Sequence, residues 1–513
     1  MHVNALDLPE DSIVHADLCI VGAGAAGIAM AADWLQSKCP IVLLEAGGFE
    51  LDDAIQDSYR AEIAGAPYLP LDATRLHYFG GTSNIWGGLC MRFDADDFLP
   101  RSWVPGSGWT IELADVEPFY AMAEKVLQIC TAGPRGAARS RDPTAAGRPL
   151  PFDPGRITSK LCHYSPPTRL GPRYKDELVR SRNVRLFTAA KVLEIVANEA
   201  LTEVDSIRFT TPDRRTHAVR ARHYVLACGA IENARLLLAS NRQHAAGLAN
   251  WHDQVGRYFM DHPSVITGAH LHLRTARPMQ HYWHEFQATR PRAMLCLTAE
   301  QRRAHQILNC TVELDPNGGG SVSEPPWRHR RPDSRTFLSI WKQSEAANAA
   351  GGLPTADPVT RTTEMSFQCE PAPNPDSRVL LSGERDLFGM PRVRLDWRVG
   401  DLESRTVYKM CELLRRETRR ARIGDVIAAD WLPRDARSLR QFMVEAGFHP
   451  MGTTRMHSDP RHGVVDRNCR VHGLSNLWIA GASVFTTGSA AHPTLTLVAL
   501  ALRLSQHLKT HFD

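Results

Sequence analysis

Three glycines and one acid near the N-terminus have the spacing of a chemical site. Gly22, Gly24 and Gly27 form a Gly-x-Gly-x-x-Gly pattern, and Glu45 follows 18 positions after the last glycine. In dinucleotide-binding proteins the first glycine permits a tight turn, the second lets backbone amides approach a pyrophosphate, and the third lets a helix pack on a strand. The acid accepts hydrogen bonds from ribose hydroxyls. The pattern predicts a dinucleotide site, and an ordinary glycine-rich turn is the alternative.

The elements that must position these residues are visible on either side of them. Residues 17–21 predict a buried strand, residues 28–35 predict a helix, and residues 41–44 predict a second buried strand that ends at the acid. A helix that starts at the glycine turn directs its N-terminus at the phosphates. Residues 224–230 form another apolar run with a glycine turn, which we expect to return a strand to the same sheet.

The glycine pattern alone does not separate FAD from NAD. It occurs once, at the extreme N-terminus of a chain of 513 residues. A second nucleotide site would usually bring a second fingerprint. The single N-terminal copy therefore favours a tightly held FAD.

Composition indicates a large folded protein without strong charge. The length corresponds to about three domain-sized units, and glycine and proline together supply 69 residues, as in ordinary globular chains. A net charge of +4, from 60 basic and 56 acidic side chains, does not suggest a nucleic-acid partner.

Cysteine spacing and the chain ends suggest a compartment. The two nearest of the 11 cysteines are 14 positions apart, so no zinc-type pair exists, and we predict free thiols and no metal site. The first 12 residues lack the basic and apolar parts of a secretion signal, and the apolar run at 495–502 is too short to span a bilayer. We predict a cytoplasmic protein without a membrane span.

Alternating patterns later in the chain predict a second structural unit. Residues 264–273 and 392–397 read as antiparallel strands. With the N-terminal unit they predict an α/β fold, α+β overall, in which a Rossmann-like FAD-binding domain of discontinuous segments joins a mixed domain with an antiparallel sheet. Residues 316–332 predict a glycine- and proline-rich loop.

Three further segments resemble the glucose-methanol-choline (GMC) oxidoreductases. Residues 78–88 resemble the flavin-contacting loop of that family, residues 256–263 include its Asp-His-Pro segment, and residues 447–502 include its His-x-x-Gly-Thr motif. The resemblance spans the chain and is greatest to the bacterial branch with pyranose oxidase-like, glycoside oxidase-like and gluconate dehydrogenase-like members. It implies an FAD-binding domain and a substrate-binding domain. The expected limits are 1–100, 181–263 and 435–513 for the first, and 101–180 and 264–434 for the second.

The resemblance also implies the site residues. Two side chains near the C-terminus face the flavin in this family, and the matching positions are His449 and His492. A neutral imidazole can remove the hydroxyl proton during alcohol oxidation, so His449 is the predicted general base, and His492 is predicted to orient the hydroxyl. His262 is interpreted as structural. Beyond the fingerprint, the predicted cofactor contacts are Gly81, Thr82, Asn84, Ile85, Val192, Ala227, Gly229, Ala482, Pro493 and Thr494.

Three positions refine the expected cofactor site. Ile85 stands where covalently flavinylated relatives carry a histidine, and isoleucine cannot form that bond, so the FAD is predicted to be non-covalent. For Asn84, a plain turn is the alternative to a flavin contact. Pro493 opens an apolar helix, whose N-terminus would stabilise the negative charge of a reduced flavin.

The predicted reaction is oxidation of a CH–OH group of a sugar, glycoside or polyol to a carbonyl, with hydride transfer to flavin N5 and oxygen or quinone as acceptor. One alternative is a dehydrogenase subunit that passes electrons to a quinone or haem partner. An alternative from another class is an FAD-containing cyanohydrin lyase. Specificity is expected to come from residues 264–434, where Trp327 and Trp341 could stack on a sugar. Neither the substrate nor the oligomeric state follows from the sequence.

Overall fold

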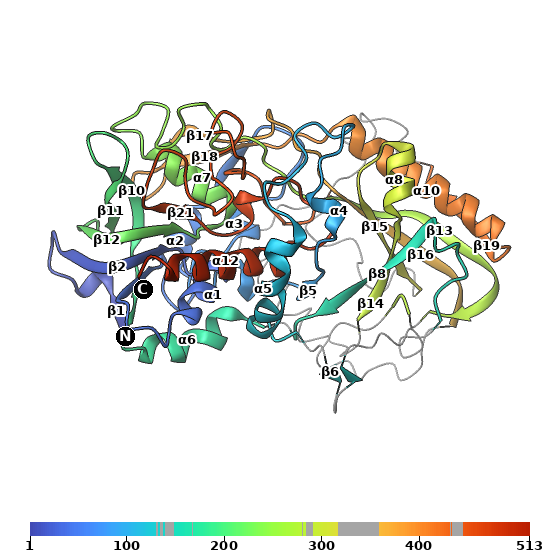
Figure 1. Cartoon of the computed structure of the whole chain (residues 1–513), viewed down its shortest axis with the longest axis horizontal. Helices are drawn as coiled ribbons and strands as arrows, with labels where there is room; N and C mark the ends of the chain where they lie inside the picture. Colours follow the sequence, from blue (N-terminus) through green and yellow to red (C-terminus); the bar gives the residue numbers. More distant parts are fainter. Residues whose placement is uncertain are drawn as a thin grey trace.

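The computed structural model contains two large β-sheets that lie at opposite ends of the long axis of the molecule (Figure 1). Both chain termini lie beside the first sheet. The residues described are 1–129, 132–133, 137–138, 148–166, 168–279, 281–283, 291–316, 359–430, 432 and 445–512. Trp327, Trp341 and most of the loop at 316–332 lie outside them.

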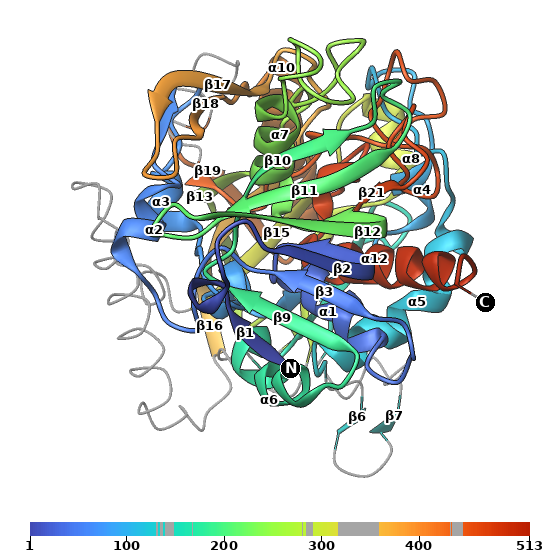
Figure 2. The ribbon, with the colours of Figure 1, turned by 90° about the vertical axis from the view of Figure 1, so that its left-hand side faces the viewer.

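The first sheet has a parallel centre and an antiparallel edge (Figure 2). The strands β1, β9, β3, β2 and β12 run parallel, β21 pairs parallel with β12, and β11 and β10 continue antiparallel. Every residue of β3 is buried, as expected for an apolar strand covered on both faces. In sheet order the bounds are β1 (His2–Asn4), β9 (Val184–Thr188), β3 (Ile41–Leu44), β2 (Ile13–Val21), β12 (Thr216–Leu226), β11 (Val204–Thr210) and β10 (Lys191–Ala197), with β21 (Leu477–Ile479) beside β12.

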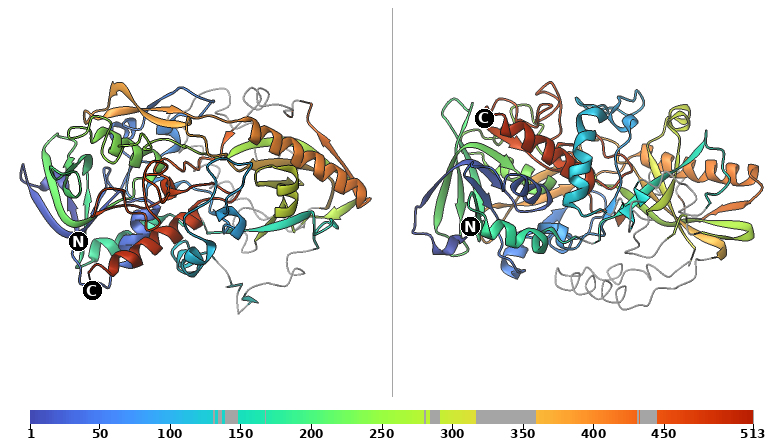
Figure 3. Two further views of the ribbon diagram at one scale, coloured as in Figure 1. Left: turned by 45° about the horizontal axis from the view of Figure 1, so that its top comes forward. Right: turned by 60° about the horizontal axis from the view of Figure 1, so that its bottom comes forward.

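The strands expected at 17–21, 41–44 and 224–226 are thereby confirmed, and helices follow the first and the third after short turns. The helix α1 (Ala25–Asp33) begins three residues before the predicted start, and α7 (Gly229–Ala239) follows β12. The C-terminal helix α12 (Thr494–Lys509) packs against α1 and against α5 (Leu113–Val126), and Figure 3 shows α12 in red beside α5. Small alanine side chains in α1 favour helix formation and allow this close packing.

The second sheet is antiparallel and includes the strand predicted at 264–273. Two helices, α8 (Ala299–His305) and α10 (Asp401–Arg420), pack against it (Figure 3). Val407, Met410 and Leu414 are buried on one face of α10, at the spacing of an amphipathic helix. In sheet order the bounds are β19 (Gly424–Ala428), β13 (Pro263–Pro278), β16 (Val359–Cys369), β15 (Cys310–Asp315), β14 (Arg292–Leu297), β8 (Ile157–Tyr164) and β5 (Leu89–Cys90), with β20 (Glu445–Ala446) beside β13.

The strand predicted at 392–397 forms, but it lies outside the two large sheets. It is β18 (Pro391–Asp396), which pairs antiparallel with β17 (Arg378–Arg385) and parallel with β4 (Ala61–Ile63) in a separate small sheet. A segment expected in the substrate-binding domain therefore pairs with one expected in the FAD-binding domain. The domain limits themselves stay a prediction.

The remaining elements are short. They are η1 (Ala5–Asp7), α2 (Asp53–Asp57), α3 (Leu71–Thr74), η2 (Gly81–Asn84), α4 (Ala95–Phe98), β6 (Ala132–Gly133), β7 (Ala137–Ala138), α6 (Leu170–Arg180) and η4 (Ala482–Val484).

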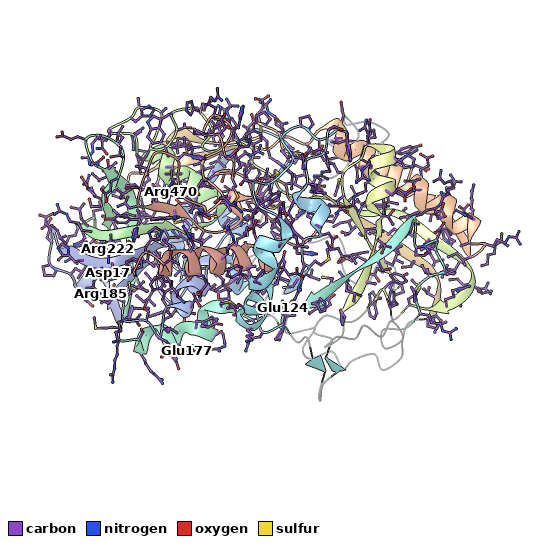
Figure 4. The ribbon with its side chains drawn as sticks, viewed as in Figure 1. Asp17, Glu124, Glu177, Arg185, Arg222 and Arg470 are labelled. Carbon is purple, nitrogen blue, oxygen red and sulfur yellow. The ribbon has the colours of Figure 1, made fainter. Side chains whose placement is uncertain are left out.

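The surface mixes opposite charges, and the described cysteines are free. Arg222 lies 3.8 Å from the carboxylate of Asp17, and Figure 4 labels the two beside each other. Of the ten cysteines within the described ranges, none forms a disulfide. Among the helices of the described residues, none has the length and apolar character needed to cross a membrane.

Candidate active site

A cavity of about 490 Å³ lies at the C-terminal ends of β2, β3 and β12, the position where parallel α/β sheets bind ligands. Gln368 of β16 also lines it, so the cavity extends from the first sheet to the second. All predicted site residues line this cavity except Gly27 and Asn84. Those that line it are Gly22, Gly24, Glu45, Gly81, Thr82, Ile85, Val192, Ala227, Gly229, His449, Ala482, His492, Pro493 and Thr494.

The three glycines of the fingerprint have different surroundings. Gly22 has a φ of +100°, in the left-handed region that favours glycine. A Cβ on Gly24, the N-cap of α1, would meet no atom within 4 Å, because this glycine faces open space at the cavity. A Cβ on Gly27 would lie 1.9 Å from the carbonyl oxygen of Gly22. Gly27 thus allows the helix to pack on the turn, while Gly24 leaves room for a ligand.

Glu45 follows β3 and is buried at the cavity. Its Oε2 accepts a hydrogen bond from the Ala23 amide and its Oε1 accepts one from the Gly47 amide, each at 3.0 Å. Burial raises the pKa of Glu45, and the amides and the nearby Lys191 oppose that rise. A carboxylate has about four acceptor positions, so these two bonds leave capacity for ribose hydroxyls.

A buried charge cluster that the sequence did not indicate lies beside Glu45. Lys191 Nζ is 3.2 Å from Glu232 Oε2, and Arg235 is 3.3 Å from the same carboxylate. Burial alone would raise the pKa of Glu232, but Arg235 and Lys191 lower it to about 2. Lining side chains missed by the sequence analysis include Tyr59, Arg75, His77, Lys191, Glu232 and Gln368. They come from separate segments, and no local spacing links them.

The conformation of the loop at 79–85 depends on two glycines with positive φ and on a hydrogen bond from a side chain to the loop's own backbone. Gly80 has a φ of +98° and Gly81 a φ of +53°. Asn84 Nδ2 donates to the Phe79 carbonyl at 2.9 Å, so the structure places Asn84 within the turn and not at the cavity, in line with the alternative reading. Ile85 is buried and lines the cavity.

His449 and His492 converge on the cavity from different elements. Their ring centroids are 5.2 Å apart with an interplanar angle of 84°. His449 lies in the loop after β20, and its amide donates to Asp261 Oδ1 at 2.9 Å. His492 directly precedes Pro493, which is the N-cap of α12. The structure therefore brings the two predicted histidines together.

Burial keeps both histidines neutral. It lowers the pKa of His492 to about 3. For His449, burial is again the main cause, and His262, His492 and Arg75 add to it, so the pKa lies well below the usual range. A neutral imidazole can accept a proton, which is the chemistry predicted for this position.

His262 contacts His449 directly. Their Nδ1 atoms are 2.9 Å apart, and His262 Nε2 is 2.8 Å from the Ser489 carbonyl oxygen. Ligand-type atoms of Asp261, His262 and His449 all lie within 4.8 Å of one another. Asp261 accepts from Tyr68 and from the His449 amide, so these groups form a hydrogen-bond network. The predicted lack of a metal site stays a prediction.

Comparisons with known proteins address the family. Two family models, both described as GMC oxidoreductase, match residues 73–264 and 373–501. The chain is 28% identical to 6'''-hydroxyparomomycin C oxidase of Streptomyces lividus, over 96% of this chain and 91% of that protein. It is 26% identical to paromamine 6'-oxidase of Streptomyces fradiae, over 98% and 92%. It is 23% identical to the fructose dehydrogenase large subunit of Gluconobacter japonicus, over 95% and 96%.

Solved structures share the fold. Pyridoxine 4-oxidase from Mesorbium loti aligns with a TM-score of 0.55 at 18% identity, over 97% of this chain and 99% of that one. Formate oxidase aligns with a TM-score of 0.54 at 17% identity, over 98% and 99%. The predicted fold class is confirmed. With a glycine turn at the cavity and both family models matched, the chain belongs to the GMC oxidoreductases, FAD-dependent enzymes that oxidise CH–OH groups.

Proposed function

We propose that this protein oxidises a hydroxyl-bearing carbon of a sugar, glycoside or polyol, with His449 as the base that removes the hydroxyl proton. The observation that carries the proposal is the pair of neutral histidines, with ring centroids 5.2 Å apart, on the cavity that the fingerprint also lines. A neutral imidazole close to a hydroxyl is a suitable general base.

The residues present fit the cofactor of the family. The amides around Gly24 and the N-terminus of α1 would hold the pyrophosphate, and Glu45 would hold the ribose. The N-terminus of α12 at Pro493 and Thr494 would stabilise negative charge on the ring system. When bound, FAD supplies a hydride acceptor at its N5.

We propose that this FAD is held without a covalent bond. Ile85 has no nucleophilic atom. Cys228 also lines the cavity, but burial raises the pKa of its thiol to about 12, and the thiol donates to the Val21 carbonyl. Denaturation should therefore release free flavin into the supernatant.

Residues of this chain accept the hydroxyl proton of the substrate and stabilise the charge that results. As the C–H bond breaks and the carbonyl forms, the hydroxyl oxygen loses its proton to His449. The Asp261 carboxylate, within 4.8 Å of the His449 ring nitrogen, favours the resulting imidazolium. We assign His492, on the same cavity, the task of orienting the hydroxyl.

The cavity and the relatives' names support one substrate class. The matched relatives are named for paromamine, hydroxyparomomycin and fructose, which supports a sugar or glycoside. Among the described lining residues the carboxylates are those of Glu45 and Glu232. Lys191 forms an ion pair with Glu232, and its positive charge also lowers the pKa of Glu45. The described part of the cavity thus offers no unpaired carboxylate to select an amino sugar, and we favour a neutral hydroxyl compound.

The electron acceptor is either oxygen, which the two relatives named as oxidases support, or a quinone, for which a relative named as a dehydrogenase is the precedent. After anaerobic reduction, rapid reoxidation in air supports an oxidase. Slow reoxidation in air with fast recovery on adding a quinone supports a dehydrogenase. We also propose a cytoplasmic location, which the free cysteines support.

The first experiment is the visible spectrum of the purified protein under anaerobic conditions, with glucose, fructose, methyl glucoside, glycerol and paromamine added separately. We expect a yellow protein that one or more of these compounds bleaches. A yellow protein that none of them bleaches, together with cleavage of mandelonitrile, would instead support the lyase alternative.

A further inference from the structure

We propose that His262 is a positioning residue that fixes the tautomer of His449, so that Nε2 of His449 carries the free lone pair. This inference rests on the proposed function, because it assigns an atom to the base. It gives a specific role to a residue that the sequence presented only as structural.

The assignment starts at the carbonyl of Ser489. A carbonyl oxygen can only accept, so the 2.8 Å contact requires a proton on His262 Nε2. His262 is fully buried, and burial lowers its pKa to about 4, so the ring is neutral and its Nδ1 is an acceptor. The 2.9 Å contact between the two Nδ1 atoms then requires a proton on His449 Nδ1. The remaining nitrogen of a neutral His449, Nε2, is left as the base.

Both ends of this chain of hydrogen bonds are fixed by the fold. Ser489 has a φ of +51°, and its hydroxyl donates to Asp97 Oδ2 at 2.8 Å. At the other end the His449 amide donates to Asp261, the neighbour of His262 in sequence. The dipeptide that directly precedes β13 thus holds the backbone of His449 through its first residue and the ring through its second.

The space around the two rings is equally restricted. A Cβ on Gly447 would lie 2.8 Å from His449 Nδ1 and 3.1 Å from His262 Cβ. The Gly447 amide donates to the His262 carbonyl at 2.9 Å. Gly447 therefore leaves the gap in which the two Nδ1 atoms meet.

The arrangement also keeps the abstracted proton on His449. Once Nε2 is protonated, the Nδ1–H of His449 donates more strongly to His262, as charge-assisted bonds do. Further transfer would place a positive charge on His262, which is fully buried and hard to protonate. The His449 imidazolium remains beside the Asp261 carboxylate instead.

Two substitutions at one position separate this role from simple packing. An asparagine amide lies near the position of His262 Nδ1, so His262→Asn can still accept from His449. A glutamine amide lies near the position of Nε2, so His262→Gln keeps the bond to Ser489 and leaves His449 without its acceptor. We expect His262→Gln to slow anaerobic flavin reduction by the best donor of the panel about 10- to 100-fold, with the donor's Kd unchanged. His262→Asn should stay within about tenfold of wild type.

A second measurement is independent of turnover and of the folding of the two His262 variants. In wild-type protein labelled with [15N]histidine, the His449 ring, identified by the signals lost in His449→Asn, should show a protonated Nδ1 and an unprotonated Nε2. An Nε2–H tautomer would overturn the proposal, and so would equal rates for the two His262 variants. If wild-type flavin is never reduced by any donor, the proposed function fails instead, and the tautomer is still read from the spectrum.

Discussion

Removal of the His449 imidazole is the most direct perturbation of the proposed chemistry. A positioned base contributes about 10²- to 10⁴-fold to rate, which is about 3 to 6 kcal/mol at about 1.4 kcal/mol per factor of ten. The neutral ring of His492, with its centroid 5.2 Å from that of His449, can replace the base in part. We therefore expect His449→Ala to slow flavin reduction by at least about 10²-fold, the lower end of that range.

The fold should tolerate this change. Asp261 accepts from the backbone amide at position 449, which alanine retains. The substitution removes the hydrogen-bond partner of His262 Nδ1, which should lower the free energy of unfolding by about 1 to 3 kcal/mol. The variant should therefore stay yellow and folded.

The assay is anaerobic stopped-flow reduction at increasing donor concentration, which separates the limiting rate constant from the donor's Kd. His252→Ala, a change at an exposed histidine outside the cavity, is the matched control and should match wild type. A limiting rate constant for His449→Ala equal to that of the control would remove His449 from the base role.

Three further outcomes follow from the same geometry. Gly24→Leu should fold but purify without flavin, because its side chain enters the cavity. Gly383→Leu, at an exposed glycine where a Cβ also meets no atom, should retain flavin. Equal flavin content in the two variants would contradict the fingerprint assignment. Because burial lowers the pKa of His449 and of His492, neither ring takes up a proton as the pH falls through 6.5, whereas burial raises the pKa of Asp261 to about 6. The reduction rate should therefore be constant from pH 8 to 7 and decline only as Asp261 is protonated at lower pH; a decline that is half complete above pH 7 would refute this. Gly447→Ala should keep flavin but slow its reduction, because the added Cβ lies 2.8 Å from His449 Nδ1, and an unchanged rate would show that the ring position is not critical.

The nucleotide half of the site could be read from the sequence because its parts are local. One strand, one turn and one helix place Gly22 and Gly24, and the next strand places Glu45, all within a single βαβ unit. The tasks of the glycines follow from backbone geometry, which residue type reveals directly. The pair His449 and His492 followed from the resemblance, since nothing in the spacing alone distinguishes two among 22 histidines.

The unpredicted parts depend on contacts between distant segments. His262 and His449 are 187 positions apart and meet only because β13 pairs with β20 just before the histidine loop. Lys191 and Glu232 lie on β10 and α7, and their ion pair leaves no periodic signal. The strand β18 was recognised, but its alternating pattern does not specify β4 as its partner.

The start of β13 links the reacting centre to both sheets. Met260 forms a bridge with Met451, on the other side of His449 in the loop, and Pro263 pairs with Ala446. The base is therefore held by the strand that continues into the second sheet. His492, by contrast, precedes α12, which packs on α1 below the glycine turn. A hydroxyl held between the two histidines is thus positioned by both parts of the molecule. His449 ties it to the second sheet, and His492 ties it to the dinucleotide site. A shift between the two sheets would therefore separate the base from the residue that orients the substrate.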